Sequence, residues 1–239
     1  MRLESILFGD MKSYKRMARV FAVSVEHNSP STPLTVRHLS NVEKEFGTQQ
    51  GYIRSNYFNN TIKTIEHNRI VQSITDDEVV GLMDSDMLVL DDLSSVVEMD
   101  FDLAYTVRPE GSKFPINSGV IFIRGSQKVR DWYNTWEAKV RELVADKKWL
   151  RSGNKIYGGI NQTALGWMLA QDHDLNLLTL PCPIWNCENE SWKYFSQDTK
   201  IVHILGGLRG HVCHNHPVVV PAAKPIAVIW RKYERLTKE

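Results

Sequence analysis

The sequence has few cysteines, almost no net charge and no long apolar run. Its three cysteines in 239 residues are too few for a disulfide scaffold, so we expect a reducing, cytoplasmic environment. Lys and Arg total 29 against 28 for Asp and Glu, which argues against a general nucleic-acid-binding protein. No export signal is visible at the start, and the most apolar late stretch, Val218–Trp230, is interrupted by Pro221 and Pro225. We therefore expect no transmembrane segment.

The composition is that of a globular protein with a substantial core. Apolar residues make up 42% of the chain, and the aromatics comprise 8 Phe, 8 Tyr and 7 Trp. No internal repeat, low-complexity tract or long linker divides the sequence. The length fits one large domain or two small ones. We expect a single domain over residues 1–239, with Arg231–Glu239 as a solvated end.

Hydrophobic patterning predicts alternating strands and helices. We expect buried strands at Arg19–Val25, Glu78–Met83, Leu103–Val107 and Gly119–Ile123, and helices at Thr32–Phe46 with a C-cap at Gly47, about Asn59–Ile74, Ser94–Met99, Ser126–Leu150 and Asn161–Ala170. Strands that are apolar on both faces belong in a sheet covered by helices. The pattern predicts an α/β fold with a mostly parallel central sheet flanked by helices.

Two acids, Asp84 and Asp86, follow the strand predicted at Glu78–Met83. In extended backbone, residues i and i+2 face the same side about 7 Å apart, so both carboxylates can approach one cation. Ligands of open α/β sheets bind at this end of the strands, and carboxylates that hold a divalent cation beside phosphates are common there. Helix capping or simple solvation explains a lone acid-x-acid motif equally well.

A second motif, Lys200–Arg209, places His203 after a β-rich run and then offers Gly206, Gly207 and Arg209. Imidazole suits a metal such as manganese, and a guanidinium can fork onto phosphate oxygens. Together these residues fit a metal diphosphate. A histidine after a strand can also be a satisfied core or turn residue.

Two further polar turns could contact a sugar. Asn117 precedes the strand predicted at Gly119–Ile123, where its amide could orient hydroxyl groups or form an ordinary Asx turn. Asn161 and Gln162 follow Gly158-Gly159 at the start of a predicted helix. Helix capping explains Asn161 but does not explain Gln162.

Taken in order, four blocks resemble the signature set of glycosyltransferase family 8, and its glycogenin-like members most closely. The resemblance runs from about Val20 to Arg209 and rests on Asp84-Ser-Asp86, Asn117-Ser-Gly-Val120, Gly158-Gly-Ile-Asn-Gln162 and Val202-His-Ile-Leu-Gly-Gly-Leu-Arg209. It implies a GT-A fold that binds a nucleotide-diphosphate sugar, commonly a UDP-hexose, with Mn²⁺ or Mg²⁺. It also implies transfer of the hexose to a glycan, lipid or protein acceptor with retention of anomeric configuration.

The resemblance assigns roles residue by residue. Asp84, Asp86 and His203 would ligate the metal, and Gly206 and Arg209 would approach the diphosphate. Asn117 and Gln162 would face the donor sugar, Lys63 would be a basic residue near the donor, and Val25 would end a uracil-binding strand. The donor-binding half would cover about 19–125, the acceptor and catalytic half about 126–216, and a C-terminal tail 217–239.

Three departures from the family pattern bear on these roles. Asn161 stands where the family has an acid, so a sugar-nucleotide-binding pseudoenzyme is an alternative to a transferase. Arg209 replaces a lysine and presents a planar fork instead of a point charge. The segment between Phe46 and Asn59 has no clear second strand, so nucleotide binding is trimmed or that strand lies in Met1–Asp10.

Two other interpretations compete with these. The acid pair also resembles that of haloacid dehalogenase-type phosphohydrolases, although that class needs its nucleophile near the N-terminus. The cluster His211-Val-Cys-His-Asn-His216 could bind zinc, but its spacing fits no common zinc motif and a loop closing over the diphosphate or acceptor is the favoured role.

Overall fold

The computed structural model describes residues 1–9, 11–40, 55–218 and 220–237. The predicted Gly47 cap, residues 41–46 of the predicted Thr32–Phe46 helix and most of the segment between Phe46 and Asn59, where we expected no clear strand, lie outside these residues. The strands are β1 (Arg2–Phe8), β2 (Leu34–Leu39), β3 (Val79–Asp84), β4 (Met87–Val89), β5 (Leu103–Val107), β6 (Ile116–Arg124), β7 (Leu177–Pro181) and β8 (Ile201–His203). The α-helices are α1 (Lys12–Asn28), α3 (Ser55–Ser73), α4 (Gln127–Ala145), α5 (Lys147–Tyr157), α6 (Ile160–Leu169), α7 (Cys182–Trp185), α8 (Gly206–His214) and α9 (Lys224–Leu236). Short 3-10 turns are η2 (Ser94–Glu98), η3 (Trp192–Tyr194) and η4 (Pro221–Ala223).

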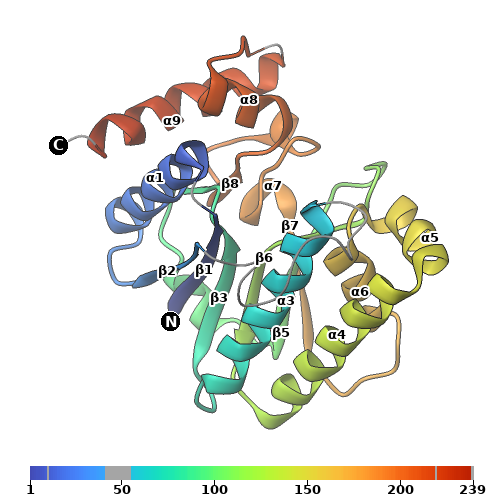
Figure 1. Cartoon of the computed structure of the whole chain (residues 1–239). Coiled ribbons are helices and arrows are strands. Elements are labelled where there is room, and N and C mark those ends of the chain that lie inside the picture. Colours follow the sequence, from blue (N-terminus) through green and yellow to red (C-terminus); the bar gives the residue numbers. More distant parts are fainter. Residues whose placement is uncertain (10, 41–54, 219, 238–239) are drawn as a thin grey trace.

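A six-stranded sheet in the order β2-β1-β3-β6-β5-β7 forms the centre of the molecule (Figure 1). The pairs β1·β2, β1·β3 and β5·β7 are parallel, whereas β6 runs antiparallel to both of its neighbours. A small antiparallel sheet of β4 and β8 lies beside it. The predicted α/β architecture with a mostly parallel sheet is confirmed.

Both faces of the central sheet are buried, as the uninterrupted apolar strands predict. In β3, Val80 and Leu82 pack with α3, α4 and α6, whereas Val79 and Met83 point to the opposite face, where α1, β4 and α7 lie. Alternating residues of β6 divide in the same way. Helices therefore cover the sheet on both sides, and its strand ends are left for binding.

An outer layer of α8 and α9 packs against α1 (Figure 1). Trp230 of α9 is fully buried in this layer, and Tyr233 and Glu234 are buried as well. Our prediction that Arg231–Glu239 is a solvated end is thus wrong for Arg231–Leu236, which continue helix α9.

The predicted strand at Arg19–Val25 is also wrong, because these residues belong to helix α1. Phe21 and Val25 of α1 pack toward the central sheet, and Met17 and Val20 pack toward α8 and α9. A helix buried on two sides is apolar around much of its circumference, so its sequence loses the contrast that distinguishes it from a strand. The first strand is instead β1, within the Met1–Asp10 segment that we had considered only as a place for the missing second strand.

Two other elements differ from the predictions. Residues 34–39 form the edge strand β2 and not part of a helix, and the period-two alternation of Leu34 and Val36 is the feature that fits this strand. The helix predicted at Ser126–Leu150 is divided into α4 and α5 at Asp146, whose carboxylate accepts hydrogen bonds from the amides of Lys148 and Trp149 and so begins a second helix.

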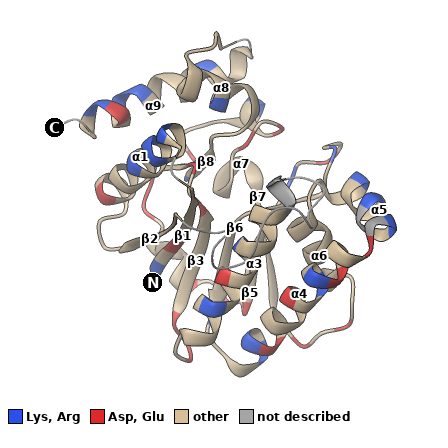
Figure 2. Cartoon of the chain, viewed as in Figure 1, with Lys and Arg blue, Asp and Glu red and all other residues tan. Residues whose placement is uncertain are grey.

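The remaining predicted elements are confirmed with shifts of a few residues: α3, β3, η2, β5, β6 and α6. No described helix is long and apolar enough to cross a bilayer. Basic and acidic residues are both spread over several helices, among them α1, α4 and α9 (Figure 2).

Candidate metal centre and ligand pockets

The two acids and the histidine predicted as metal ligands come together at the carboxyl end of β3. Asp84 is the last residue of β3, and Asp86 follows in the turn that leads into β4. Strand β4 then pairs with β8 in a register that places Met87 opposite His203. The hydrogen bond from the Ile204 amide to the Asp86 carbonyl, 2.8 Å, closes this junction. Residues separated by more than a hundred positions are thus held by strand pairing.

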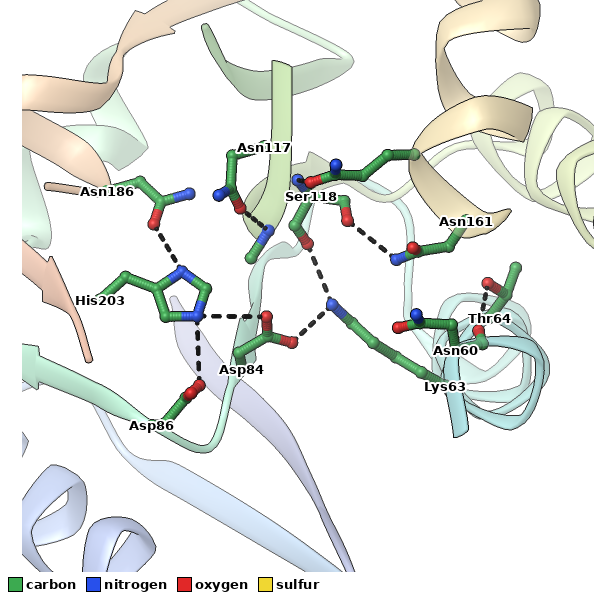
Figure 3. A network of polar contacts seen from close by, with 12 residues as sticks. Asn60, Lys63, Thr64, Asp84, Asp86, Asn117, Ser118, Asn161, Asn186 and His203 are labelled. Atoms are coloured by element: carbon green, nitrogen blue, oxygen red, sulfur yellow. Dashed lines mark hydrogen bonds and ion pairs between the residues drawn. The ribbon is translucent and has the colours of Figure 1, made fainter. Parts of the chain in front are cut away.

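Ligand atoms of Asp84, Asp86 and His203 all lie within 4.8 Å of one another (Figure 3). Nε2 of His203 is 3.2 Å from Oδ1 of Asp86 and 3.6 Å from Oδ2 of Asp84. This Nε2 is buried and makes no hydrogen bond with a described residue. Two carboxylates and an imidazole nitrogen that face one point form a ligand set that fits a divalent cation.

A basic side chain contacts each of the two carboxylates, Lys63 for Asp84 and Arg209 for Asp86. Nζ of Lys63, on α3, is 2.5 Å from Oδ1 of Asp84 and donates a hydrogen bond to the carbonyl of Ser118 (Figure 3). Arg209, in α8, pairs with Asp86 through Nη2 and donates from Nε to the Ile204 carbonyl at 3.2 Å. Lys63 and Arg209 therefore balance the charge of the two aspartates.

The pKa of Asp86 reflects this crowding. Burial alone would raise it, but the neighbouring His203 and Arg209 together lower the pKa well below its ordinary value. Burial likewise disfavours the charged form of Arg209, yet Asp86 outweighs it and raises the pKa of the guanidinium. Asp86 is therefore an anion and Arg209 a cation at every physiological pH.

The far side of the His203 ring contacts Asn186 and Gly119. Nδ1 of His203 is 3.0 Å from Oδ1 of Asn186, which is fully buried (Figure 3). A Cβ added to Gly119 would lie 2.6 Å from Cε1 and 2.8 Å from Nδ1 of His203. Only glycine at position 119 leaves room for the ring in this place.

Asn117 and Ser118, in β6, connect the cluster of Asp84, Asp86 and His203 with α6. Oδ1 of Asn117 accepts a hydrogen bond from the Gly119 amide at 2.8 Å, and Asn117 lines a pocket beside this cluster. Nδ2 of Asn161 donates to Oγ of Ser118 at 2.8 Å (Figure 3), and Oε1 of Gln162 accepts from the Ser118 amide at 3.1 Å. Gln162 also donates to the Tyr157 carbonyl, so its amide group is held at both ends.

Two pockets meet at this cluster. The first, here called the Tyr14 pocket, has a volume of about 360 Å³ and is lined by Phe8, Tyr14 and Asn59 together with both aspartates and Arg209. The second, the Gln162 pocket, has about 200 Å³ and is lined by Asn117, Asn161 and Gln162 together with His203 and Arg108. Asn60, Lys63 and Asp84 line both pockets, so the pockets share a wall. A third cavity of about 390 Å³, the Glu110 cavity, lies against Pro109, Glu110 and Glu190.

Val25 is the site residue that the structure places elsewhere. It lies in helix α1, buried to 97% in the core, and not at the end of a strand. Ile6 and Phe8 of β1, the strand that comes first in the chain, line the Tyr14 pocket. Gly206 opens α8 with a φ of 49°, directly after Leu205, which lines the Gln162 pocket.

The histidine cluster at 211–216 does not form a metal site among the described residues. Nδ1 of His211 contacts the carbonyl of His216, and the rings of His214 and His216 are 5.6 Å apart and tilted. Asp84, Asp86 and His203 are the one group of three or more candidate ligands that converges in the described part of the chain.

Sequence reasoning missed several residues of the site. Arg108 lines the Gln162 pocket and forms a buried ion pair with Glu188 at 3.0 Å. The sequence signal for Arg108 was its position as a basic residue directly after the strand predicted at Leu103–Val107. Asn186 gave a weaker one, as a lone amide within an aromatic and cysteine-rich stretch. Tyr14 gave none, since its helix was not recognised.

Comparisons with known proteins bear on the fold. No model of a known protein family matches the sequence, and no curated protein does. Among solved structures, the galactosyltransferase LgtC, in complex with donor and acceptor sugar analogs, superposes with a TM-score of 0.61 at 15% identity over 99% of this chain and 96% of that one. The chain has the GT-A glycosyltransferase fold. The GT-A fold predicted from the four motif blocks is thus confirmed.

Two further structures share the GT-A fold with this chain. A glycosyltransferase involved in glycosylating the major capsid of PBCV-1 has a TM-score of 0.62 at 14% identity, over 90% of this chain and 98% of the other. The glycosyltransferase GlyE of Streptococcus pneumoniae TIGR4 has a TM-score of 0.60 at 17% identity over 98% of this chain. The present chain spans 61% of the length of GlyE.

Proposed function

We propose that this protein is a metal-dependent glycosyltransferase that moves a hexose from a nucleotide-diphosphate sugar, a UDP-sugar, to a glycan, lipid or protein acceptor with retention of configuration. The observation that carries the proposal is the position of the Asp84, Asp86 and His203 cluster. In a GT-A fold, this cluster lies where the Tyr14 and Gln162 pockets share a wall. A diphosphate that joins a nucleoside to a sugar needs a cation at such a junction.

The residues that would hold the ion are Asp84, Asp86 and His203. An imidazole with two carboxylates suits Mn²⁺, and the carboxylates alone would also accept Mg²⁺. When bound, the ion supplies positive charge against which the diphosphate can bind and depart. The Tyr14 pocket would then take the nucleoside, because it offers aromatic rings and amide side chains, and the Gln162 pocket would take the hexose.

The leaving diphosphate would be stabilised by the two cations that now contact the aspartates. Arg209 has a planar guanidinium that can bind two oxygens, and Lys63 brings a point charge from the opposite wall. Both line the Tyr14 pocket, and Lys63 lines the Gln162 pocket as well. Charge grows on the diphosphate as the glycosidic bond breaks, so both interactions strengthen in the transition state.

The hexose would be oriented by Asn117 and Gln162. The Gly119 amide occupies the side-chain oxygen of Asn117, so the amide hydrogens of this pocket-lining residue would be its means of binding hydroxyl groups. Oε1 of Gln162 is held by the Ser118 amide and retains a lone pair for positive charge that develops at the anomeric carbon. One of the LgtC structures with this fold carries an active-site Gln-to-Glu substitution, so a glutamine belongs to the active site of that enzyme.

Retention is supported by the acids around the hexose pocket. An inverting transferase needs a carboxylate base on the face opposite the leaving group. Among the described residues that line the Gln162 pocket, Asp84 is the one acid, and it is paired with Lys63. Asn161 and Gln162 are amides and cannot act as a base. We therefore propose a front-face path in which the departing diphosphate helps to deprotonate the acceptor.

Two alternatives differ in what they predict. A pseudoenzyme would bind the sugar nucleotide without turnover, and Asn161 is the residue that favours it. A haloacid dehalogenase-type phosphohydrolase has lost its support, because the fold is GT-A and the acids follow β3 and not the first strand.

The test is a screen of the full chain against UDP-glucose, UDP-galactose, UDP-N-acetylglucosamine and GDP-sugars, each with Mn²⁺ or with chelator. Ligands that bind the folded state raise the unfolding temperature, and the stabilisation grows with the logarithm of their concentration over Kd. We expect stabilisation by UDP-sugars with Mn²⁺ and little in chelator. UDP release on prolonged incubation would then separate an enzyme from a pseudoenzyme. Equal stabilisation with and without metal would contradict the proposed metal role.

A further inference from the structure

A chain of buried hydrogen bonds leads away from the metal cluster into the central sheet. Nδ1 of His203 contacts Oδ1 of Asn186 at 3.0 Å, and Nδ2 of Asn186 donates to Oγ1 of Thr106 at 2.8 Å. Oγ1 of Thr106 in turn donates to the backbone carbonyl of Asn117 at 2.7 Å. All four residues are buried, with Asn186 and Thr106 fully inaccessible.

The direction of each bond in this chain follows from its last member. A backbone carbonyl can only accept, so the single hydroxyl hydrogen of Thr106 points to Asn117. The oxygen of Thr106 is then left with lone pairs, and Asn186 must turn its NH₂ group toward it. That orientation directs the Asn186 oxygen at His203, and an oxygen acceptor requires a hydrogen on Nδ1. A flipped amide would place its oxygen against the lone pairs of Thr106 and its NH₂ group against Nδ1 of His203, which could accept only without a hydrogen of its own.

We propose that Asn186 and Thr106 are positioning residues that keep a hydrogen on Nδ1 of His203 and thereby present the lone pair of Nε2 to a divalent cation. This inference rests on the proposed metal role of His203. Nε2 is the buried atom without a hydrogen bond, and it faces both aspartates. Partners that fix the second nitrogen of a metal-binding histidine commonly change metal affinity 10- to 100-fold. Gly119 completes the support, because its missing Cβ leaves space for the ring.

The first arm of the test uses ¹⁵N NMR of the histidine rings in chelator, so that it does not depend on metal binding. We expect Nδ1 of His203 to carry a hydrogen at every pH, whether the ring is neutral or charged. In T106V, which removes the hydroxyl, the amide of Asn186 is free to flip and the neutral ring should gain the form with hydrogen on Nε2. T106S keeps the hydroxyl and should restore the wild-type spectrum.

The second arm measures the affinity for Mn²⁺ alone by calorimetry. We expect N186A and T106V to lose about 10-fold or more, and T106S to stay near wild type. T199V is a matched control, because Thr199 is also buried and its hydroxyl donates to a backbone carbonyl, that of Pro183, outside this chain of bonds. Thermal unfolding of each variant shows that it is folded.

The two arms separate the possible failures. A wild-type ring that carries its neutral-state hydrogen on Nε2 would overturn the proposed role of Asn186 and Thr106, whatever the metal does. An altered spectrum in folded T106V with unchanged Mn²⁺ affinity would overturn the link to the metal. Absence of Mn²⁺ binding in the wild type, with Nδ1 protonated, would instead reject the proposed metal-dependent function.

Discussion

The guanidinium of Arg209 pairs with the carboxylate of Asp86, the more buried of the two aspartates in the cluster. Its Nε also donates to the carbonyl of Ile204, so one planar group contacts an acid and the backbone together. The same carboxylate is a candidate ligand for the metal. Arg209 and a bound metal ion would therefore share Asp86. A diphosphate bound between the metal ion and Arg209 would draw the guanidinium toward its oxygens.

Replacing Arg209 with Ala should separate metal binding from chemistry. We expect Arg209→Ala to bind Mn²⁺ alone at least as well as wild type, because Asp86 loses a competing cation, while sugar transfer falls by about 10²- to 10³-fold. Arg209→Lys keeps the charge without the planar fork, so its rate of sugar transfer should lie between those of the wild type and Arg209→Ala. Calorimetry and UDP-release rates measure the two effects.

A matched control for this variant is Arg130→Ala. Arg130 also joins a backbone carbonyl, that of Ile74, to an aspartate, Asp76, but it lies away from the pockets. The Arg130→Ala substitution should leave the affinity for Mn²⁺ and the rate of turnover unchanged. Wild-type turnover in Arg209→Ala would move the contact with the leaving group to Lys63.

Replacing either aspartate should abolish metal-dependent nucleotide binding. Asp84→Asn and Asp86→Asn each remove a negative ligand, and a diphosphate then has no cation to bind against. Asp91→Asn is the control, since Asp91 pairs with Lys200 at the same 2.5 Å that separates Asp84 from Lys63, but outside the site. Titration calorimetry of UDP with Mn²⁺ measures the affinities. Unchanged UDP affinity in the double Asp84→Asn, Asp86→Asn variant would exclude a metal bridge.

The sequence predicted this cluster better than it predicted the elements around it. Asp84 and Asp86 follow a strand that is apolar on both faces, and this pattern depends only on local residues. His203 is brought to them by the pairing of β4 with β8, which periodicity could not show. The resemblance to family 8 supplied that link, because motif order carries the long-range contact.

The N-terminal part shows where the local signal fails. Helix α1 is covered by the sheet on one side and by α8 and α9 on the other, so Val20–Val25 has the apolar run of a strand. The error moved the predicted base-binding residue to Val25, although β1 brings Ile6 and Phe8 to the pocket. Polar residues fixed by tertiary hydrogen bonds, such as Asn186, were missed for a similar reason, because their partners are distant in sequence.

Gly119→Ala should weaken Mn²⁺ binding by displacing the His203 ring. The new Cβ would lie 2.6 Å from Cε1 of His203, so the ring or strand β6 must move. We expect a lower unfolding temperature and a loss of metal affinity in the single variant. In the His203→Ala background the ring is gone but Oδ1 of Asn117 still lies 2.9 Å from the new Cβ, so the same substitution should cost less stability than in the wild type. Thermal unfolding of the four proteins in this cycle tests the contact, and equal losses in both backgrounds would place the strain elsewhere.

The stereochemical outcome and Asn161 can be tested together. Asn161 is the second residue of α6, where a carboxylate is favoured by the helix dipole, and the Ser118 hydroxyl that now accepts from Nδ2 can turn to donate to an aspartate. Asn161→Asp should therefore fold as well as wild type and raise or maintain the rate of transfer or donor hydrolysis. A large loss of rate in a folded Asn161→Asp protein would show that the amide has a role of its own.

Proton NMR of the first-formed product decides between retention and inversion. From an α-linked donor we expect an α-linked product, because Asp84, the one acid among the described residues that line the Gln162 pocket, is paired with Lys63, and Glu110 and Glu190 line a separate cavity. A β-linked product would refute retention and would direct attention to Glu110 and Glu190. Substituting each of these by Gln would then identify the base, since loss of the deprotonating carboxylate should lower transfer by about 10²- to 10⁴-fold while donor binding stays intact.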